Sequence, residues 1–122
     1  MRPRLTFNYK EKLHLQKDFK RVFKTGRRLA HPAILIYVCR RGDLSDTRRL
    51  GLVTGRRVGG AVERNRVKRR LREIFRLNKD RFVSSLDIIF IPKSGICALD
   101  YETLRNTVLG LLRNAGIFTP AD

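Results

Sequence analysis

Positively charged side chains are concentrated in one stretch of the chain. From Arg64 to Arg76 the sequence reads RNRVKRRLREIFR, which holds seven basic residues and one acid. Arginine and lysine side chains donate hydrogen bonds and accept none, so this stretch is suited to holding phosphate groups. Asn65 is the exception, because its amide both donates and accepts. It either contacts a ligand or bonds to the backbone near the start of a helix.

Apolar residues within the same stretch repeat at helical spacing. Four of them would form one narrow stripe on a helix, at positions i, i+4, i+7 and i+8: Val67, Leu71, Ile74 and Phe75. The spacing predicts a helix over residues 61–78 that docks through this stripe and presents its basic side chains outward.

The whole chain shares this excess of positive charge. Its 28 lysines and arginines outnumber 11 acids, which gives a formal net charge of +17 and a pI of about 11.3. Such a charge favours association with a polyanion through counterion release, and nucleic acid is the first candidate. A solvated charged surface is the alternative, although such surfaces mix the two signs of charge more evenly.

Folded RNA fits the charge layout better than duplex DNA. The predicted basic helix is charged around most of its circumference, whereas a helix that reads a DNA groove carries a few base-contacting side chains. A helix-turn-helix motif would need a second helix joined by a short turn, but glycines and a predicted strand precede this helix. We therefore expect RNA rather than DNA as the partner.

Length and composition indicate one domain over residues 1–122, with an irregular segment at about 1–12. Cys39 and Cys97 show neither metal-ligand nor redox spacing and are expected to be buried and reduced. No stretch reaches the roughly 18 apolar residues that span a membrane, and the N-terminus lacks the apolar core of a signal peptide. The sequence therefore predicts a cytoplasmic protein with no membrane partner.

Helix and strand patterns alternate along the first half of the chain. A helix is expected from Asp18, an acid in its first turn, to Gly26, which would form a left-handed cap. Residues 33–39 and 50–54 are rich in β-branched side chains and are expected to form neighbouring antiparallel strands. A short extra strand is expected near Arg28.

The second half adds one strand and one helix. Residues 86–91 (LDIIFI) form a nearly unbroken apolar run, which suits a strand covered on both faces. Asp100 can cap a last helix, which Gly116 would close. Together these patterns predict three helices packed on a mixed sheet of about four strands, of the α+β or the α/β class.

Residues for independent catalysis are scarce. His14 and His31 are not spaced as a metal-binding pair, and the acids stand singly among basic residues without the paired carboxylates of two-metal catalysis. The chain carries no glycine motif of the P-loop or dinucleotide-binding type. We expect neither a catalytic residue nor a metal ligand in this protein.

One segment resembles a known family signature. The run from Arg57 to Phe75 resembles the signature of the bacterial ribonuclease P protein component, which is centred on an Arg-Asn-Arg core. Three further segments are similar to the first helix, central strand and last helix of that family: residues 18–26, the strand around Tyr37, and residues 99–116. Order and spacing agree from about residue 13 to residue 116.

The resemblance implies the α+β class, as an α/β sandwich with a left-handed crossover around the basic helix, and a role as the protein subunit of ribonuclease P. In that family a large RNA subunit removes the 5′ leader of precursor tRNA by Mg²⁺-dependent hydrolysis, and the protein alone is expected to be inactive. Eight residues would contact the RNA subunit and phosphates near its Mg²⁺ ions: Arg56, Arg57, Arg64, Asn65, Arg66, Lys68, Arg69 and Arg72. Three aromatic residues would form a groove for the single-stranded leader: Phe19, Phe23 and Tyr37.

The sequence also supports other interpretations. Without the resemblance, Phe19, Phe23 and Tyr37 would be assigned to ordinary helix-to-sheet core. A small ribosomal or ribosome-assembly protein would share the size, charge and mixed fold, and a cationic membrane-surface protein would share the charge but not the strands.

The chain departs from the family pattern at two positions. Asparagine is common in the family where Gly60 and His31 stand in this sequence. The first departure affects the start of the basic helix, and the second affects any RNA contact from the loop at His31. Glu63 places an acid within the signature and is expected to orient a neighbouring group rather than repel RNA.

Overall fold

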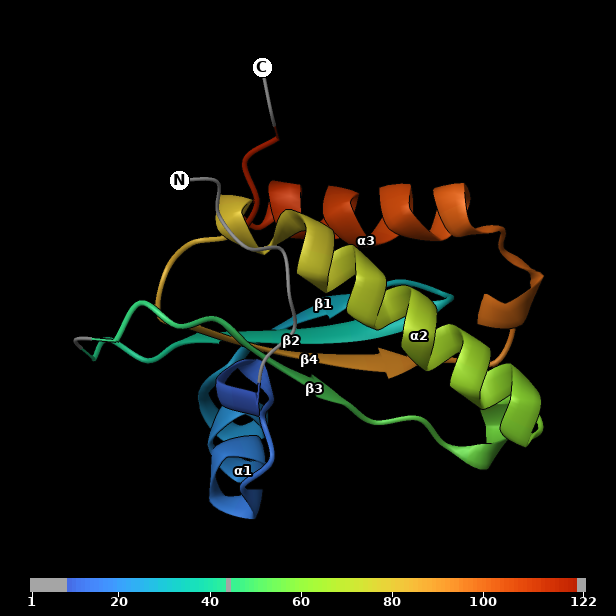
Figure 1. Cartoon of the computed structure of the whole chain (residues 1–122), viewed down its shortest axis with the longest axis horizontal. Helices are drawn as coiled ribbons and strands as arrows, with labels where there is room; N and C mark the ends of the chain where they lie inside the picture. The colour runs from blue at the N-terminus through green and yellow to red at the C-terminus, as the bar shows by residue number, and fades with distance from the viewer. Residues whose placement is uncertain (1–8, 44, 121–122) are drawn as a thin grey trace.

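Strands from both halves of the chain form one mixed sheet. The structure, a computed structural model, describes residues 9–43 and 45–120, and within these it contains a four-stranded sheet in the order β1-β2-β4-β3 (Figure 1). The strands are β1 (Arg27–Ala30), β2 (Ile34–Arg40), β3 (Arg49–Leu52) and β4 (Leu86–Pro92). Neighbouring strands β1, β2 and β4 pair antiparallel, whereas β3 pairs parallel with β4.

Three helices cover the two faces of this sheet. They are α1 (Gln16–Thr25), α2 (Ala61–Asn78) and α3 (Tyr101–Asn114). Helix α1 lies on one face, and α2 and α3 lie on the other (Figure 1). The α+β class, the three helices, the extra strand near Arg28 and the bounds of the basic helix are confirmed.

The predicted pairing of the second and third strands is wrong. β2 and β3 are not neighbours, because β4 lies between them and pairs with both. The apolar run of β4 explains this position, since a strand that is covered on both faces is stabilised most at the centre of a sheet. The connection from β3 through α2 to β4 therefore joins two parallel neighbours.

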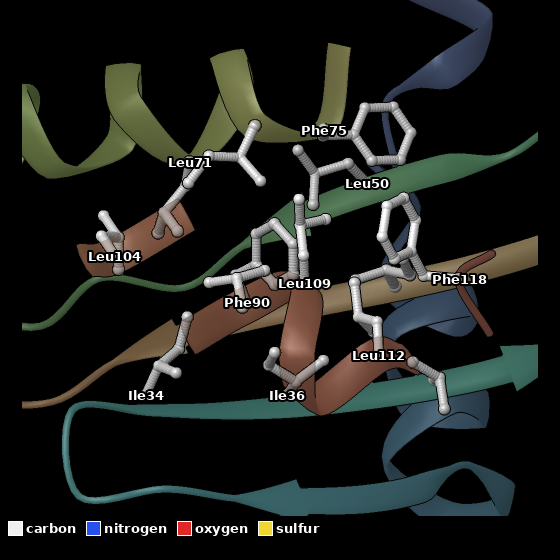
Figure 2. Packing of buried hydrophobic residues seen from close by; sticks show 14 of the residues in the cluster. Ile34, Ile36, Leu50, Leu71, Phe75, Phe90, Leu104, Leu109, Leu112 and Phe118 are labelled. Carbon is white, nitrogen blue, oxygen red and sulfur yellow. The ribbon is translucent and has the colours of Figure 1, made fainter. Parts of the chain in front are cut away.

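The larger core lies between the sheet and the pair α2 and α3. Alternate strand residues point into this core. All four residues of the predicted apolar stripe of α2 are buried in it: Val67, Leu71, Ile74 and Phe75. Figure 2 shows side chains from α2, α3 and three strands converging in this layer. Because the stripe of α2 is used for packing, the opposite side of that helix is available for binding.

A much smaller core lies on the α1 face. Its buried members are Leu13, Val22 and Ile89. Gly51 on β3 allows the close approach of α1, since a Cβ atom there would lie 2.7 Å from Cε1 of Phe19. The α1 layer therefore depends on few apolar contacts.

Helix ends follow the predicted chemistry with one exception. The Asp100 carboxylate accepts a hydrogen bond of 2.7 Å from the Thr103 amide and caps α3, and Gly116 adopts the left-handed conformation with φ 77°. Gly26 is not a left-handed cap, because its φ is −77° and its ψ is 160°. A glycine is required there for space, since a Cβ atom would lie 2.4 Å from the Val22 carbonyl oxygen.

The two edges of the sheet differ. At the β3 edge, the segment before α1 adds a short parallel bridge between Lys12 and Leu50, with the Leu13 amide donating to the Leu50 carbonyl at 2.9 Å. At the other edge, β1 is four residues long and begins with Arg27 and Arg28.

Candidate nucleic-acid interface

The outward side of α2 forms a basic surface. Asn65, Arg69 and Arg72 follow one another at i, i+4 and i+7 and are all exposed, with exposed Arg66 beside them. The helix places them opposite its buried stripe. We call Asn65, Arg66, Lys68, Arg69 and Arg72 the α2 surface; of these, Lys68 is half-buried.

Three other arginines of α2 bond to the protein itself. Arg64 donates to the Gly59 carbonyl at 2.9 Å, and Arg70 donates to the Leu99 carbonyl at 3.2 Å. Arg76 donates to the Glu73 carboxylate at 3.1 Å, and this bond lowers the pKa of Glu73. Arg64, predicted to bind RNA, is thus half-buried and holds the turn before α2.

Gly60, one of the two departures from the family pattern, precedes α2 and has no side chain with which to cap it. The Gly60 amide donates to Oε1 of Glu63 at 3.3 Å, so the acid within the signature caps the first turn. Glu63 therefore orients backbone, as expected. Asn65 is exposed, and the described residues include no side-chain hydrogen bond from it to the helix start.

The three aromatic residues predicted for the leader lie together on the α1 face. Phe23 and Tyr37 meet edge to face with ring centroids 5.0 Å apart, and Phe19 lies 6.5 Å from Phe23. None of the three is fully buried, and Phe23 is 41% exposed. Phe19 and Tyr37 pack against the small core, whereas Phe23 leaves a large part of its ring accessible beside them.

The same face of the sheet continues beyond α1 into a pocket. Ile91 lies on the same face of the sheet as Tyr37. Together with Val53 and Pro92, it forms the apolar side of a pocket of about 620 Å³. Arg56, Arg57 and Lys93 line the same pocket. The structure therefore places Arg56 and Arg57 between the aromatic cluster and the start of α2, rather than on the α2 surface.

A group of charged side chains fills the other end of the α1 face. Asp87 on β4 is completely buried, and three arginines bind its carboxylate. Arg41 donates to it at 2.8 Å, Arg49 donates with two nitrogens at 2.8 Å each, and Arg21 of α1 completes the group. Asp18 of α1 lies 3.4 Å from Arg49. We call Asp18, Arg21, Arg41, Arg49 and Asp87 the Asp87 network.

The Asp87 network was not predicted, although one signal was present. Burial raises the pKa of Asp87, but the bonds from Arg49 and Arg41 outweigh it and hold that pKa below its ordinary value. The carboxylate is therefore charged inside the protein. A single acid within the apolar run LDIIFI requires buried cationic partners, which is the signal that could have revealed the network.

The remaining chemically distinctive residues have structural partners. The Nδ1 atom of His31, the second departure from the family pattern, accepts a hydrogen bond of 3.0 Å from the Ala33 amide in the turn between β1 and β2. His14 is exposed and bonds to the hydroxyl of Tyr9 at 2.9 Å. Cys39 and Cys97 are free but half-buried, so the prediction that they are buried is wrong.

Clusters of metal ligands and membrane-spanning helices are both absent from the part of the chain that the structure describes. Within residues 9–43 and 45–120, no three His, Cys, Asp or Glu residues come together in a way that could hold a metal ion. No helix in that part of the chain is both long and apolar enough to cross a membrane.

Known proteins of one family are similar to this chain over most of its length. A family model described as Ribonuclease P matches residues 7–116. A ribonuclease P protein component from Petrotoga mobilis is 38% identical over 113 residues, covering 88% of this chain and 93% of that protein. The corresponding protein from Thermotoga maritima is 36% identical over 112 residues, covering 88% and 94%.

Solved structures show the same similarity. The RNase P protein of Staphylococcus aureus superimposes with a TM-score of 0.80 at 28% identity, over 89% of this chain and 98% of that one. The Thermotoga maritima RNase P protein gives a TM-score of 0.75 at 36% identity, over 85% and 96%.

Proposed function

Because this chain belongs to the family of bacterial ribonuclease P protein components, we propose that it binds the catalytic RNA subunit through α2 and the 5′ leader of precursor tRNA through the α1 face. It would assist Mg²⁺-dependent removal of the leader in the cytoplasm and be inactive alone. Family membership weighs against the ribosomal alternative, and the ordered sheet weighs against a membrane-surface protein.

The observation that carries this proposal is the separation of two different binding surfaces. The α2 surface is basic and has no aromatic residue, which suits the phosphates of a large folded RNA. The cluster of Phe19, Phe23 and Tyr37 lies on the opposite side of the sheet and suits unpaired bases, because aromatic rings stack with bases of any sequence. A protein with one RNA partner would need only the first.

The pocket beyond the aromatic cluster extends the proposed leader path. Its apolar side, Val53 and Ile91, can contact a base, and its basic side, Arg56, Arg57 and Lys93, can contact the sugar-phosphate backbone. We assign Arg56 and Arg57 to the junction between leader and RNA subunit.

The division of chemistry follows from the residues present. When bound by the RNA subunit, Mg²⁺ would supply the activated water and the charge that stabilises the leaving oxygen. The protein's own part is to neutralise neighbouring phosphates with Arg66, Arg69 and Arg72 and to hold the substrate.

The test is precursor tRNA cleavage by a bacterial ribonuclease P RNA at low Mg²⁺, with and without this protein. Substrates with a leader long enough to cross the groove and with a single-nucleotide leader are compared, and the protein alone is the control. Rescue of accurate cleavage with a larger gain for the long leader is expected. Equal gains for both leaders would contradict the proposal that the aromatic cluster binds the leader. No rescue would contradict the proposal that this protein is a subunit of the enzyme.

A further inference from the structure

Helix α1 carries two of the three aromatic residues proposed to contact the leader, yet its apolar attachment to the sheet is small. Within α1, all of which the structure describes, Val22 is the residue that is fully buried. Phe19 is half-buried and Phe23 is exposed. Apolar packing alone therefore leaves the rotation of α1 about its own axis weakly determined.

The Asp87 network holds the flank of α1 that faces away from the aromatic rings. At about 100° per residue, Phe23 lies on one side of Val22 and Arg21 lies on the other. Arg21 bonds to buried Asp87, and Asp18, one turn earlier on the same flank, pairs with Arg21 and with Arg49. The helix is thus fixed along both flanks, by rings on one and by ion pairs on the other.

The chemistry of these bonds makes them directional. Arg49 binds both oxygens of Asp87, and Arg41 binds one of them, so the carboxylate is held in a single orientation. Arg41 in turn donates to the Thr47 carbonyl at 2.6 Å and to Asp43 at 2.9 Å. The acceptor for Arg21 is therefore held by Arg41, which follows β2, and by Arg49 of β3, neither of which belongs to α1.

We propose that Asp87 is a positioning residue for leader recognition: through Arg21 it fixes the rotation of α1 that places Phe19 and Phe23 beside Tyr37. This inference rests on the proposed leader function. It assigns a role in substrate binding to a buried acid that no leader nucleotide can touch.

Asp87→Asn gives a test in which the change of charge and the loss of positioning predict opposite effects on leader binding. Loss of one of the 11 acids raises the formal net charge from +17 to +18, which by itself strengthens binding to RNA. Positioning predicts the reverse for the leader. The readout is the leader ratio, defined as kcat/KM of the holoenzyme for a long-leader precursor divided by kcat/KM for a single-nucleotide leader.

The expected result is a fall of the leader ratio by about tenfold, the scale of one lost base-stacking contact, with no loss of affinity for the RNA subunit. Amide hydrogen exchange should become faster in α1 and stay unchanged in α2 and α3. Val108→Ala, in the larger core on α3, serves as the stability control, because it should lower the melting temperature without changing the leader ratio.

A second variant keeps the test decisive if Asp87→Asn does not fold. Arg21→Met releases α1 but leaves Asp87 paired with Arg41 and Arg49. Lys17→Met is its matched control, since it removes one charge from an exposed position on the same flank of α1. Only Arg21→Met should lower the leader ratio, and combining it with Asp87→Asn should add little.

Three outcomes would overturn the inference. One is a normal leader ratio in both Asp87→Asn and Arg21→Met, which would leave the network a purely structural role. Another is an equal loss in Arg21→Met and Lys17→Met, which would show that Arg21 acts by charge alone. A wild-type leader ratio of one would overturn the proposed leader function as well, and it is recognised in the wild-type protein before any variant is made.

Discussion

The arginines of α2 divide into two groups according to what their guanidinium groups contact. Arg64 and Arg70 donate to backbone carbonyls, whereas Arg66 and Arg69 are exposed. The first group stabilises the fold through hydrogen bonds to the backbone, and the second group is available to bind phosphates. This division is invisible in the sequence, where all four appear in one basic run.

Replacing Arg66 with alanine should weaken binding to the RNA subunit and flatten its salt dependence. Each lost phosphate contact lowers the slope of log K against log salt by about 0.7 to 0.9. Arg70→Ala should instead lower the free energy of unfolding and leave the slope unchanged, because its partner is the Leu99 carbonyl. Binding measured across a salt series separates the two effects, and a wild-type slope in Arg66→Ala would contradict the assignment.

Replacing Phe23 with alanine should reduce leader binding selectively. Loss of one stacking partner costs about 1–3 kcal/mol per base, which should appear in kcat/KM for long-leader substrates. The control is Leu77→Ala on α2, another exposed apolar side chain, which should leave leader discrimination intact. A similar loss of affinity for leader and RNA subunit, or unfolding of the variant, would indicate that Phe23 has a packing role instead of a leader-binding role.

At the scale of elements, local patterns were predictable and non-local ones were not. Helical periodicity determined the bounds of α2 and its buried stripe, because that information lies within adjacent turns. The placement of β4 between β2 and β3 depends on pairing across the whole chain, which a strand pattern does not encode. The exposure of Phe23 depends on where α1 sits, and that in turn depends on Asp87.

Gly51→Ala should disturb the packing of α1 against the sheet. The added Cβ atom would lie 2.7 Å and 2.8 Å from two atoms of the Phe19 ring. Such overpacking typically costs about 1–3 kcal/mol, and the displaced ring should lower leader binding too. The control is Gly110→Ala within α3, where nothing lies within 4 Å of a new Cβ atom. Gly110→Ala should be more stable than wild type in denaturant unfolding. Equal effects of Gly51→Ala and Gly110→Ala on stability would contradict the role of Gly51 in the packing of α1.

Acidification should weaken the attachment of α1. The pKa of Asp87 is lowered in the folded protein, so its stabilising contribution is complete above its unfolded-state pKa of about 3.9 and is lost as pH falls through the folded value. Wild type should therefore lose more stability than Asp87→Asn between about pH 6 and pH 3. Urea unfolding at both pH values measures this, and parallel losses would contradict it.

The whole molecule carries a charge that opposes its own folding. A net charge of +17 on 122 residues produces self-repulsion, and the basic residues of α2 concentrate part of that charge on one helix. We therefore expect folding and RNA binding to be coupled, since a bound polyanion removes the repulsion and favours the folded state.

Sulfate should therefore raise the melting temperature more than chloride does at equal ionic strength. Both salts screen charge, but only a divalent anion bound between several basic side chains stabilises the folded state by mass action. Circular dichroism melts across a sulfate titration measure the effect. Identical melting temperatures in the two salts would show that screening alone matters.

The two protected edges of the sheet have a consequence for the protein before it meets RNA. Open strand edges recruit other chains into continuous sheets, and short or positively charged edges discourage this. Here the bridge between Lys12 and Leu50 covers one edge, while the short β1 with Arg27 and Arg28 forms the other. Newly made copies thus repel one another edge to edge, so the pool awaiting its RNA is protected from aggregation by the kind of side chain that binds RNA.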